Sequence, residues 1–185
     1  MAARLVILDR DGVINRDSEE FIRTPDEWRP IDGSLAAIAS LSAAGFEVAV
    51  ATNQSGVGRG YLDKPTLEAI HDKMRRLVRE AGGDVGKVVY CPHHPDDGCD
   101  CRKPASGLLV QLSRRYGLPL DGVPMIGDSL RDIDAALAIG GRAILVLTGN
   151  GRRTAEQLRQ RGDDIETYDN LQAAAAALVA ERKDG

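Results

Sequence analysis

Short apolar runs alternate along the chain with longer segments whose apolar residues recur at helical spacing. The short runs predict strands at Arg4 to Leu8, Glu47 to Thr52, Lys87 to Tyr90, Val123 to Gly127 and Ala143 to Leu147, with a shorter one at Glu166 to Tyr168. The longer segments predict helices at Gly33 to Ala44, Lys64 to Ala81, Gly107 to Tyr116, Leu130 to Ile139, Ala155 to Arg161 and Leu171 to Arg182. This alternation predicts an α/β fold with a doubly wound, mostly parallel sheet.

Glycines follow several predicted helices, at the positions where a left-handed C-terminal cap needs them: Gly45, Gly82, Gly117 and Gly140. No linker or internal repeat divides residues 1–185, so we expect a single domain. The gaps between predicted strands leave no room for a large cap domain. Loops are therefore expected to shape any substrate pocket.

Composition narrows the function classes. The chain has 185 residues, of which 43% are hydrophobic and 28% charged, with a net charge of −4 that predicts no general attraction to nucleic acid or to anionic membranes. Leu5 to Leu8 is too short for a signal-peptide core, and no apolar run could span a membrane, so a cytoplasmic protein is expected. Aromatic residues make up 4% of the chain, which gives little sign of a large interface and favours a monomer.

Two carboxylates, Asp9 and Asp11, follow the first predicted strand directly. Parallel strands deliver functional groups at their carboxyl ends, so both side chains are expected at the rim of the sheet. Like charges so close are hard to ionise together unless a cation lies between them. The pair therefore predicts a divalent metal with oxygen ligands, most naturally Mg²⁺.

Three further segments carry candidate chemistry. The loop after the second predicted strand offers a hydroxyl and backbone N–H groups suited to phosphate, although such residues are also ordinary turn residues: Thr52, Asn53, Gln54 and Ser55. Arg102 and Lys103 could grip phosphate and neutralise charge, although basic pairs are common on surfaces. Asp128 follows the fourth predicted strand and could complete a magnesium site, with Asp132 one helical turn further on to orient its neighbours. The plain alternative there is helix capping by Ser129.

These motifs, Asp-x-Asp, Thr-Asn, Lys and Gly-Asp-x-x-x-Asp, occur in order and each lies beside a predicted strand end. In this the chain resembles the haloacid dehalogenase (HAD) superfamily of phosphohydrolases over nearly its whole length. The resemblance implies the Rossmann-like fold of that superfamily and a phosphoaspartate mechanism. Members that cleave carbon–halogen bonds lack an acid at the position of Asp11, so a phosphatase is favoured over a dehalogenase.

The resemblance also implies a role for each matching residue. Asp9 would be the nucleophile, and Asp11 would protonate the leaving oxygen and later activate water. Thr52 would bind phosphoryl oxygens, and Lys103 would balance the charge on Asp9 and the phosphate. Asp9, the backbone carbonyl of Asp11 and Asp128 would hold Mg²⁺.

All three cysteines lie within eleven residues, in a Cys-x-His-x5-Cys-x-Cys arrangement of Cys91, His93, Cys99 and Cys101. An odd number of thiols in one short loop argues against a disulfide framework, whereas three thiolates and one imidazole make a closed, structural zinc site. The residues alone leave His94 open as an alternative ligand. His71 stands alone on its predicted helix and is expected to be a surface histidine.

A zinc loop that ends in Cys-x-Cys-Arg-Lys-Pro narrows the resemblance to two branches, the D,D-heptose 1,7-bisphosphate phosphatases and the histidinol-phosphate phosphatases. The match is closer to the first, which removes the 7-phosphate and keeps the 1-phosphate for lipopolysaccharide or surface-glycan assembly. This resemblance places the zinc ligand at His93 and makes a small sugar phosphate the expected partner.

The same resemblance implies a set of substrate-binding residues: Asp17, Ser18, Glu19, Glu20, Thr52, Asn53, Gln54, Ser55, Arg102, Lys103 and Ser129. Ser129 stands where some members carry a lysine, so Arg131 or Arg152 is an alternative source of that contact. The zinc loop is short, with five residues between His93 and Cys99, a length also seen in histidinol phosphatases. A histidinol-phosphate phosphatase is therefore the second hypothesis, and a non-catalytic module that binds a phospho-ligand is the third.

Overall fold

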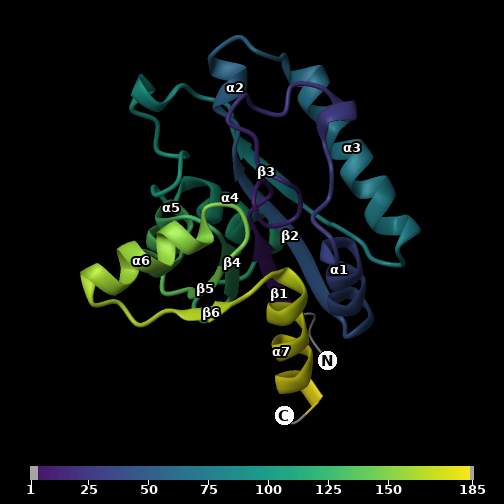
Figure 1. Ribbon diagram of the computed structural model, residues 1–185, viewed down its shortest axis with the longest axis vertical. Helices are drawn as coiled ribbons and strands as arrows, with labels where there is room; N and C mark the ends of the chain where they lie inside the picture. Colours follow the sequence, from purple (N-terminus) through teal and green to yellow (C-terminus); the bar gives the residue numbers. More distant parts are fainter. Residues whose placement is uncertain (1–3, 184–185) are drawn as a thin grey trace.

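A computed structural model describes residues 4–183 and contains one six-stranded sheet (Figure 1). The strand order is β3-β2-β1-β4-β5-β6, and each neighbouring pair is parallel. The bounds are β1 Arg4–Leu8, β2 Phe46–Asn53, β3 Val88–Cys91, β4 Pro124–Gly127, β5 Arg142–Val146 and β6 Glu166–Tyr168. The predicted strands are confirmed, and each bound lies within one residue of its prediction.

Helices cover both faces of the sheet, as Figure 1 shows. One apolar cluster packs α1 (Ser34–Ala43), α3 (Lys64–Glu80) and α7 (Leu171–Lys183) on one face, and a second packs α4 (Gly107–Tyr116), α5 (Leu130–Leu137) and α6 (Gly151–Arg161) on the other. Alternate residues of β1 serve the two clusters, because successive strand side chains point to opposite faces. The doubly wound α/β fold is thus confirmed.

Local structure departs from the prediction in a few places. Helix α6 begins at Gly151 rather than Ala155, and a Cβ at Gly151 would collide with the carbonyl oxygen of Val146. Gly151, a residue type that does not favour helices, is therefore needed at the start of α6 because the helix packs closely against β5. Three short elements were not predicted, the 3-10 helices Pro25–Glu27 (η1) and Pro95–Asp97 (η2) and the helix Ser55–Gly58 (α2).

His71 is not a surface residue, contrary to the prediction. It has no exposed surface and lies on the buried stripe of α3 with Leu67, Ile70, Met74 and Val78. Its spacing of four from Leu67 and three to Met74 puts it on the apolar face of the helix. The polar side chain of His71 suggested a surface position, but its place on the apolar face of α3 buries it.

The order of strands creates the place for a site. The chain leaves β1 toward β2 on one side and leaves the adjacent β4 toward β5 on the other, which makes the carboxyl ends of β1 and β4 a topological switch point. The N–H of Asp9 donates to the carbonyl of Ile126 at 2.9 Å, so the segment after β1 is tied to the end of β4. Among the described residues, none of the helices has the length and apolar character needed to span a membrane.

Candidate active site

Lys103 links two aspartates at the carboxyl edge of the sheet. Its Nζ lies 2.9 Å from Oδ1 of Asp9 and 2.6 Å from Oδ1 of Asp132, and it donates to the carbonyl of Ala51 at 2.7 Å. The side chain is almost wholly buried, which by itself would lower its pKa, but the charges of Asp132 and Asp9 outweigh burial and raise the pKa of Lys103. Lys103 is therefore a fixed cation beside Asp9.

Asp132 is held in place by the start of its own helix. Its Oδ2 accepts from the backbone N–H groups of Asp128 and Ser129 at 3.2 and 3.0 Å and from the Ser129 hydroxyl at 2.7 Å. Ser129 thus forms a capping box with Asp132. The capping interpretation of Ser129 is correct in the structure, and the side chain also lies at the edge of the cleft described below.

Asp128 completes a group of acids, since carboxylate oxygens of Asp9, Asp128 and Asp132 lie within 4.8 Å of one another. Oδ2 of Asp128 accepts from the backbone and side-chain amides of Asn150 at 2.7 and 3.3 Å. A Cβ at Gly12 would collide with this carboxylate, so the glycine of the Asp-x-Asp-Gly motif is required by a close approach as well as by its φ of 82°.

The charges of these acids are mutually unfavourable. Burial, followed by the charge of Asp132, raises the pKa of Asp9 to about 8 and that of Asp128 to about 7. Asp132 is neutralised by Lys103, which Asp9 shares, whereas Asp128 forms no salt bridge with any of the described residues. An oxygen-lined position crowded with carboxylates fits a hard divalent cation such as Mg²⁺.

Asp11 lies apart from that acidic group in a set of hydrogen-bond donors. Its carboxylate accepts from Nε and Nη2 of Arg10 at 3.0 to 3.2 Å, from Asn15 at 2.9 Å and from Gln54 at 2.7 Å. Burial acts to raise the pKa of Asp11, but the Arg10 guanidinium and the two amides outweigh it and hold that pKa below its ordinary value. Asp11 and Asp9 therefore occupy opposite electrostatic environments.

The end of β2 and the residue after it contact both Asp11 and the segment that carries Lys103. Nε2 of Gln54 donates to Thr52 Oγ1 at 2.9 Å as well as to Asp11. The side-chain amide of Asn53 donates to the backbone carbonyl of Lys103 and accepts from its N–H, both at 3.0 Å. Asn53 therefore ties β2 to the Arg102–Lys103 segment, so part of its hydrogen-bonding capacity is used inside the protein.

A cleft of about 310 Å³ opens above these groups. Most predicted site residues line it: Asp9, Asp11, Asp17, Ser18, Thr52, Asn53, Gln54, Ser55, Arg102, Lys103, Asp128 and Ser129. Glu19 and Glu20 are exposed and do not line this cleft. The remaining lining residues not named by the sequence prediction are Phe21, Ile22, Arg59 and Asn150.

Three arginines, Arg59, Arg102 and Arg131, line the same cleft, whereas Arg152 does not. Burial and then the charge of Arg131, with a smaller effect from Arg59, lower the pKa of Arg102. Nη1 of Arg102 is buried and has no hydrogen-bond partner among the described residues. Of the two alternatives to Ser129, the structure therefore brings Arg131 to the cleft.

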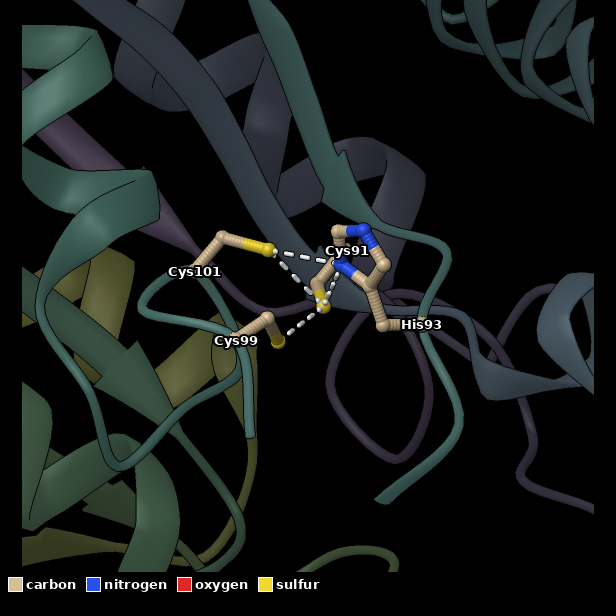
Figure 2. A group of neighbouring side chains, drawn as sticks. All are labelled: Cys91, His93, Cys99 and Cys101. Carbon is tan, nitrogen blue, oxygen red and sulfur yellow. Dashed lines mark hydrogen bonds between the residues drawn. The ribbon is translucent and has the colours of Figure 1, made fainter. Parts of the chain in front are cut away.

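The three cysteines and His93 converge beside β3, with their side chains pointing toward one another (Figure 2). Sγ of Cys91 lies 3.0 Å from Sγ of Cys101 and 3.5 Å from Sγ of Cys99, and Nδ1 of His93 lies 3.4 and 3.2 Å from Cys91 and Cys101. Three sulfurs and one nitrogen in this arrangement are a donor set that suits zinc. His94 instead uses its Nδ1 to accept from the N–H of Asp96 at the start of η2.

Comparison with known protein families gives two matches along the chain. The polynucleotide kinase 3 phosphatase sequence model matches residues 5–129, which is more than half of the chain. The HAD-hydrolase-like model matches residues 100–174. Between them these matches include every motif from Asp9 to Asp132.

Two bacterial relatives of this chain have the same name. The D-glycero-β-D-manno-heptose-1,7-bisphosphate 7-phosphatase of Pseudomonas aeruginosa is 54% identical over 179 residues, covering 97% of this chain and 99% of the relative. The protein of the same name from Escherichia coli is 36% identical over 78% of this chain and 79% of its own.

A solved structure has the same fold throughout. The D,D-heptose 1,7-bisphosphate phosphatase from Bordetella bronchiseptica, in complex with magnesium and phosphate, superposes with a TM-score of 0.91 at 50% identity, covering 96% of this chain and 99% of the other. The chain thus belongs to the HAD-type hydrolases and, among them, to the D-glycero-β-D-manno-heptose-1,7-bisphosphate 7-phosphatase family.

Proposed function

We propose that this protein hydrolyses the 7-phosphate of D-glycero-β-D-manno-heptose 1,7-bisphosphate and releases heptose 1-phosphate and inorganic phosphate. The observation that carries the proposal is the cleft itself, which has Asp9 beside a buried lysine and three arginines among the residues that line it. Such a cleft suits a small ligand with two phosphates. The names of the relatives support the sugar and its β anomer.

The proposed chemistry has two steps, each an exchange at phosphorus. A carboxylate oxygen of Asp9 attacks, the bond from phosphorus to the O7 oxygen breaks, and Asp11 gives its proton to that oxygen. Asp11 then takes a proton from water, whose oxygen attacks the aspartyl-phosphate and releases inorganic phosphate and Asp9. Because the free site keeps the pKa of Asp11 low, we expect the negative charge of the bound phosphate to raise that pKa and load the proton.

The roles of the surrounding residues follow from their contacts. Lys103 neutralises Asp9 and the entering phosphoryl group, and Asp132 keeps that lysine in position. Thr52 and the loop up to Ser55 offer donors to phosphoryl oxygens, although the Asn53 amide is already committed to Lys103. Asp9, Asp128 and the carbonyl of Asp11 would hold Mg²⁺, which when bound stabilises the charge that develops on the phosphoryl group.

We assign the retained 1-phosphate to Arg59, Arg102 and Arg131. The buried Nη1 of Arg102 is a donor without a partner in the part of the chain described, and a phosphate oxygen would satisfy it. Arg131 supplies the positive charge that Ser129 lacks. We assign the contact with the sugar to Asp17 and Ser18, which line the cleft, and not to Glu19 or Glu20, which do not.

We also propose that Cys91, His93, Cys99 and Cys101 bind zinc as a structural ion. The donor set supports a closed site with no position left for water. Arg102 and Lys103 follow Cys101 directly, so an ordered loop would place two of the proposed phosphate-binding cations. A small, soluble sugar-phosphate substrate also favours a cytoplasmic enzyme, and the net charge of −4 argues against a nucleic-acid partner.

Phosphate release is the direct test of the proposed substrate. Heptose 1,7-bisphosphate, as separate α and β anomers, and histidinol phosphate are each incubated with the Mg²⁺-loaded enzyme. We expect the β-bisphosphate to have the highest kcat/KM, with phosphate lost from C7 only. Faster turnover of histidinol phosphate would establish the second hypothesis instead, and turnover of no phosphomonoester at all would leave a binding module.

A further inference from the structure

A guanidinium and an imidazole are buried together behind Asp11. Arg10 and His71 each have no exposed surface, and Nη1 of Arg10 lies 3.3 Å from Nε2 of His71, although 61 residues separate them in the chain. Arg10 belongs to the Asp-x-Asp segment, whereas His71 belongs to α3. The proposed function uses neither side chain.

The two edges of the Arg10 guanidinium have different partners. Nε and Nη2 form one edge and both donate to the carboxylate of Asp11, while Nη1 points to His71. Arginine can only donate hydrogen bonds, so Nε2 of His71 must be the unprotonated, accepting nitrogen. In agreement, burial and the nearby charges of Arg10 and Arg75 lower the pKa of His71 to about 3.

We propose that His71 is a positioning residue for Asp11, because it holds the far end of Arg10 and so orients the edge of the guanidinium that binds the acid/base carboxylate. This inference rests on the role proposed for Asp11. A planar guanidinium has a fixed fork geometry, so anchoring one nitrogen restricts the direction of the other two. Asp11 must point toward the leaving oxygen, and its orientation depends on Arg10 together with Asn15 and Gln54.

The other explanation is a histidine that merely completes the core. The rest of the α3 stripe is apolar, and an imidazole placed there without a partner would be costly to bury. Its hydrogen-bond partner among the described residues is Arg10, the side chain that binds Asp11, and Nδ1 of the ring has no partner there. A core role predicts lower stability alone, whereas a positioning role predicts slower turnover by folded protein.

The test compares variants at position 71 that differ in hydrogen-bonding capacity. His71→Leu removes the acceptor at similar size, and His71→Gln offers an amide oxygen that can reach Arg10. We expect His71→Leu to lower kcat by on the order of tenfold, the usual size of such indirect effects on a reacting group, with KM for heptose bisphosphate changed less than about twofold. His71→Gln should recover most of the lost kcat.

Met74→Leu is the matched control, because it changes the same buried stripe one turn further along α3 and keeps the hydrogen bond between His71 and Arg10. It should keep the kcat of the unaltered enzyme even if its melting temperature falls. A folded His71→Leu with unchanged kcat would overturn the proposal. If that variant fails to fold, His71→Asn, whose shorter side chain cannot reach Arg10, takes its place against His71→Gln, and equal kcat for the two would overturn it.

A second readout does not depend on the substrate. In a crystal structure of His71→Leu, or of His71→Asn, we expect the Arg10 fork to turn away from Asp11. An Asp11 carboxylate still bound by both Nε and Nη2 would contradict the proposal even if heptose bisphosphate proved to be the wrong substrate. Failure of the unaltered enzyme to hydrolyse heptose bisphosphate would count against the proposed function only.

Discussion

At the scale of single residues, Lys103 separates two aspartates that would otherwise repel. It lies between Asp9 and Asp132, and Asp132 has further donors from Ser129 and the backbone of Asp128. Asp9 has no other cation among the described side chains that contact it. Of the two aspartates that share Lys103, the one we propose as the nucleophile therefore has the fewer hydrogen-bond donors, which suits a carboxylate that is to meet both Mg²⁺ and phosphate.

Asp9→Asn should abolish turnover. An amide has the same shape but is not a nucleophile, so we expect kcat to fall by at least about a thousandfold. Phosphate release measures the loss, and the absence of a phosphoryl adduct after acid quench shows which step is missing. Asp72→Asn, on the exposed side of α3, is the control and should keep full activity. A substantial rate in Asp9→Asn would rule out the covalent mechanism.

The pH dependence of Mg²⁺ binding should follow the raised pKa values of Asp9, about 8, and Asp128, about 7. In the metal-free protein the pKa values of both carboxyls are raised above the ordinary 3.8, so the two groups favour the folded state fully below that pH. This contribution is lost as the pH rises from 3.8 to the raised values, about 7 for Asp128 and about 8 for Asp9. Bound Mg²⁺ removes this repulsion at high pH, whereas protons compete with it at low pH.

We therefore expect the rise in melting temperature caused by Mg²⁺ to be larger at about pH 8.5 than at about pH 6. Below about pH 7 the apparent affinity should fall about tenfold per pH unit for each proton displaced. Thermal melts with and without added Mg²⁺ measure the effect. No chelator is used, because it would also remove the zinc that we propose at the cysteine–histidine loop. A Mg²⁺ effect independent of pH would show that these carboxyls do not bind the ion.

At the scale of elements, the loop from β3 to α4 joins two functions. It follows Cys91 at the end of β3, contains η2 and carries, near its end, the two cations that line the cleft, Arg102 and Lys103. The backbone N–H of Gly107 donates to the carbonyl of Asp100 at 3.0 Å, and the Asn53 amide holds Lys103 from the neighbouring strand. Because Arg102 and Lys103 follow Cys101 directly, the conformation of the cysteine–histidine loop determines where these two cations lie in the cleft.

His93→Ala and His94→Ala should separate the two histidines of this loop. Loss of one of four ligands should lower the zinc content of His93→Ala from about one ion per chain toward none, and displacement of Arg102 and Lys103 should lower kcat/KM. His94→Ala removes only a cap of η2, so its zinc content should stay normal. Elemental analysis and phosphate release check both variants, and zinc loss from His94→Ala with normal His93→Ala would reverse the assignment.

Elements also show how far the sequence could predict this site. Asp9 and Asp128 each follow a strand whose apolar run is plain, and Thr52 lies near the end of another, so parallel-sheet geometry brings them to one edge. Asn150 follows β5 in the same way, and the same reasoning could have found it. Phe21, Ile22 and Arg59 come from irregular loops, and Phe21 has a φ of 66° that no periodicity predicts.

At the scale of the whole molecule, the sheet is covered on both faces and the cleft is built by loops rather than a second domain. The exposed large hydrophobic residues in the described part of the chain are Tyr61, Val110, Leu118 and Leu137. They belong to separate segments, before α3, in α4, after α4 and at the end of α5.

We therefore expect a monomer in solution. Light scattering coupled to gel filtration should give the mass of one chain, unchanged on tenfold dilution and with Mg²⁺ present. Leu137→Glu should leave that mass and the activity unaltered, because it adds a charge to an exposed side chain. A stable dimer whose mass falls in the Leu137→Glu variant would instead locate an interface at the end of α5.

The amino-acid sequence by itself determined the α/β class, the strands, the order of the motifs and the cysteine–histidine loop, because these depend on local periodicity and on spacings within a few residues. Tertiary structure alone decided which distant side chains meet. Lys103 reaches Asp9 across 94 residues and His71 reaches Arg10 across 61, and local sequence contains no trace of such pairings. Burial acts to raise the pKa of both aspartates, and their neighbours then decide the outcome: the charge of Asp132 adds to the rise at Asp9, whereas Arg10 and two side-chain amides outweigh burial at Asp11.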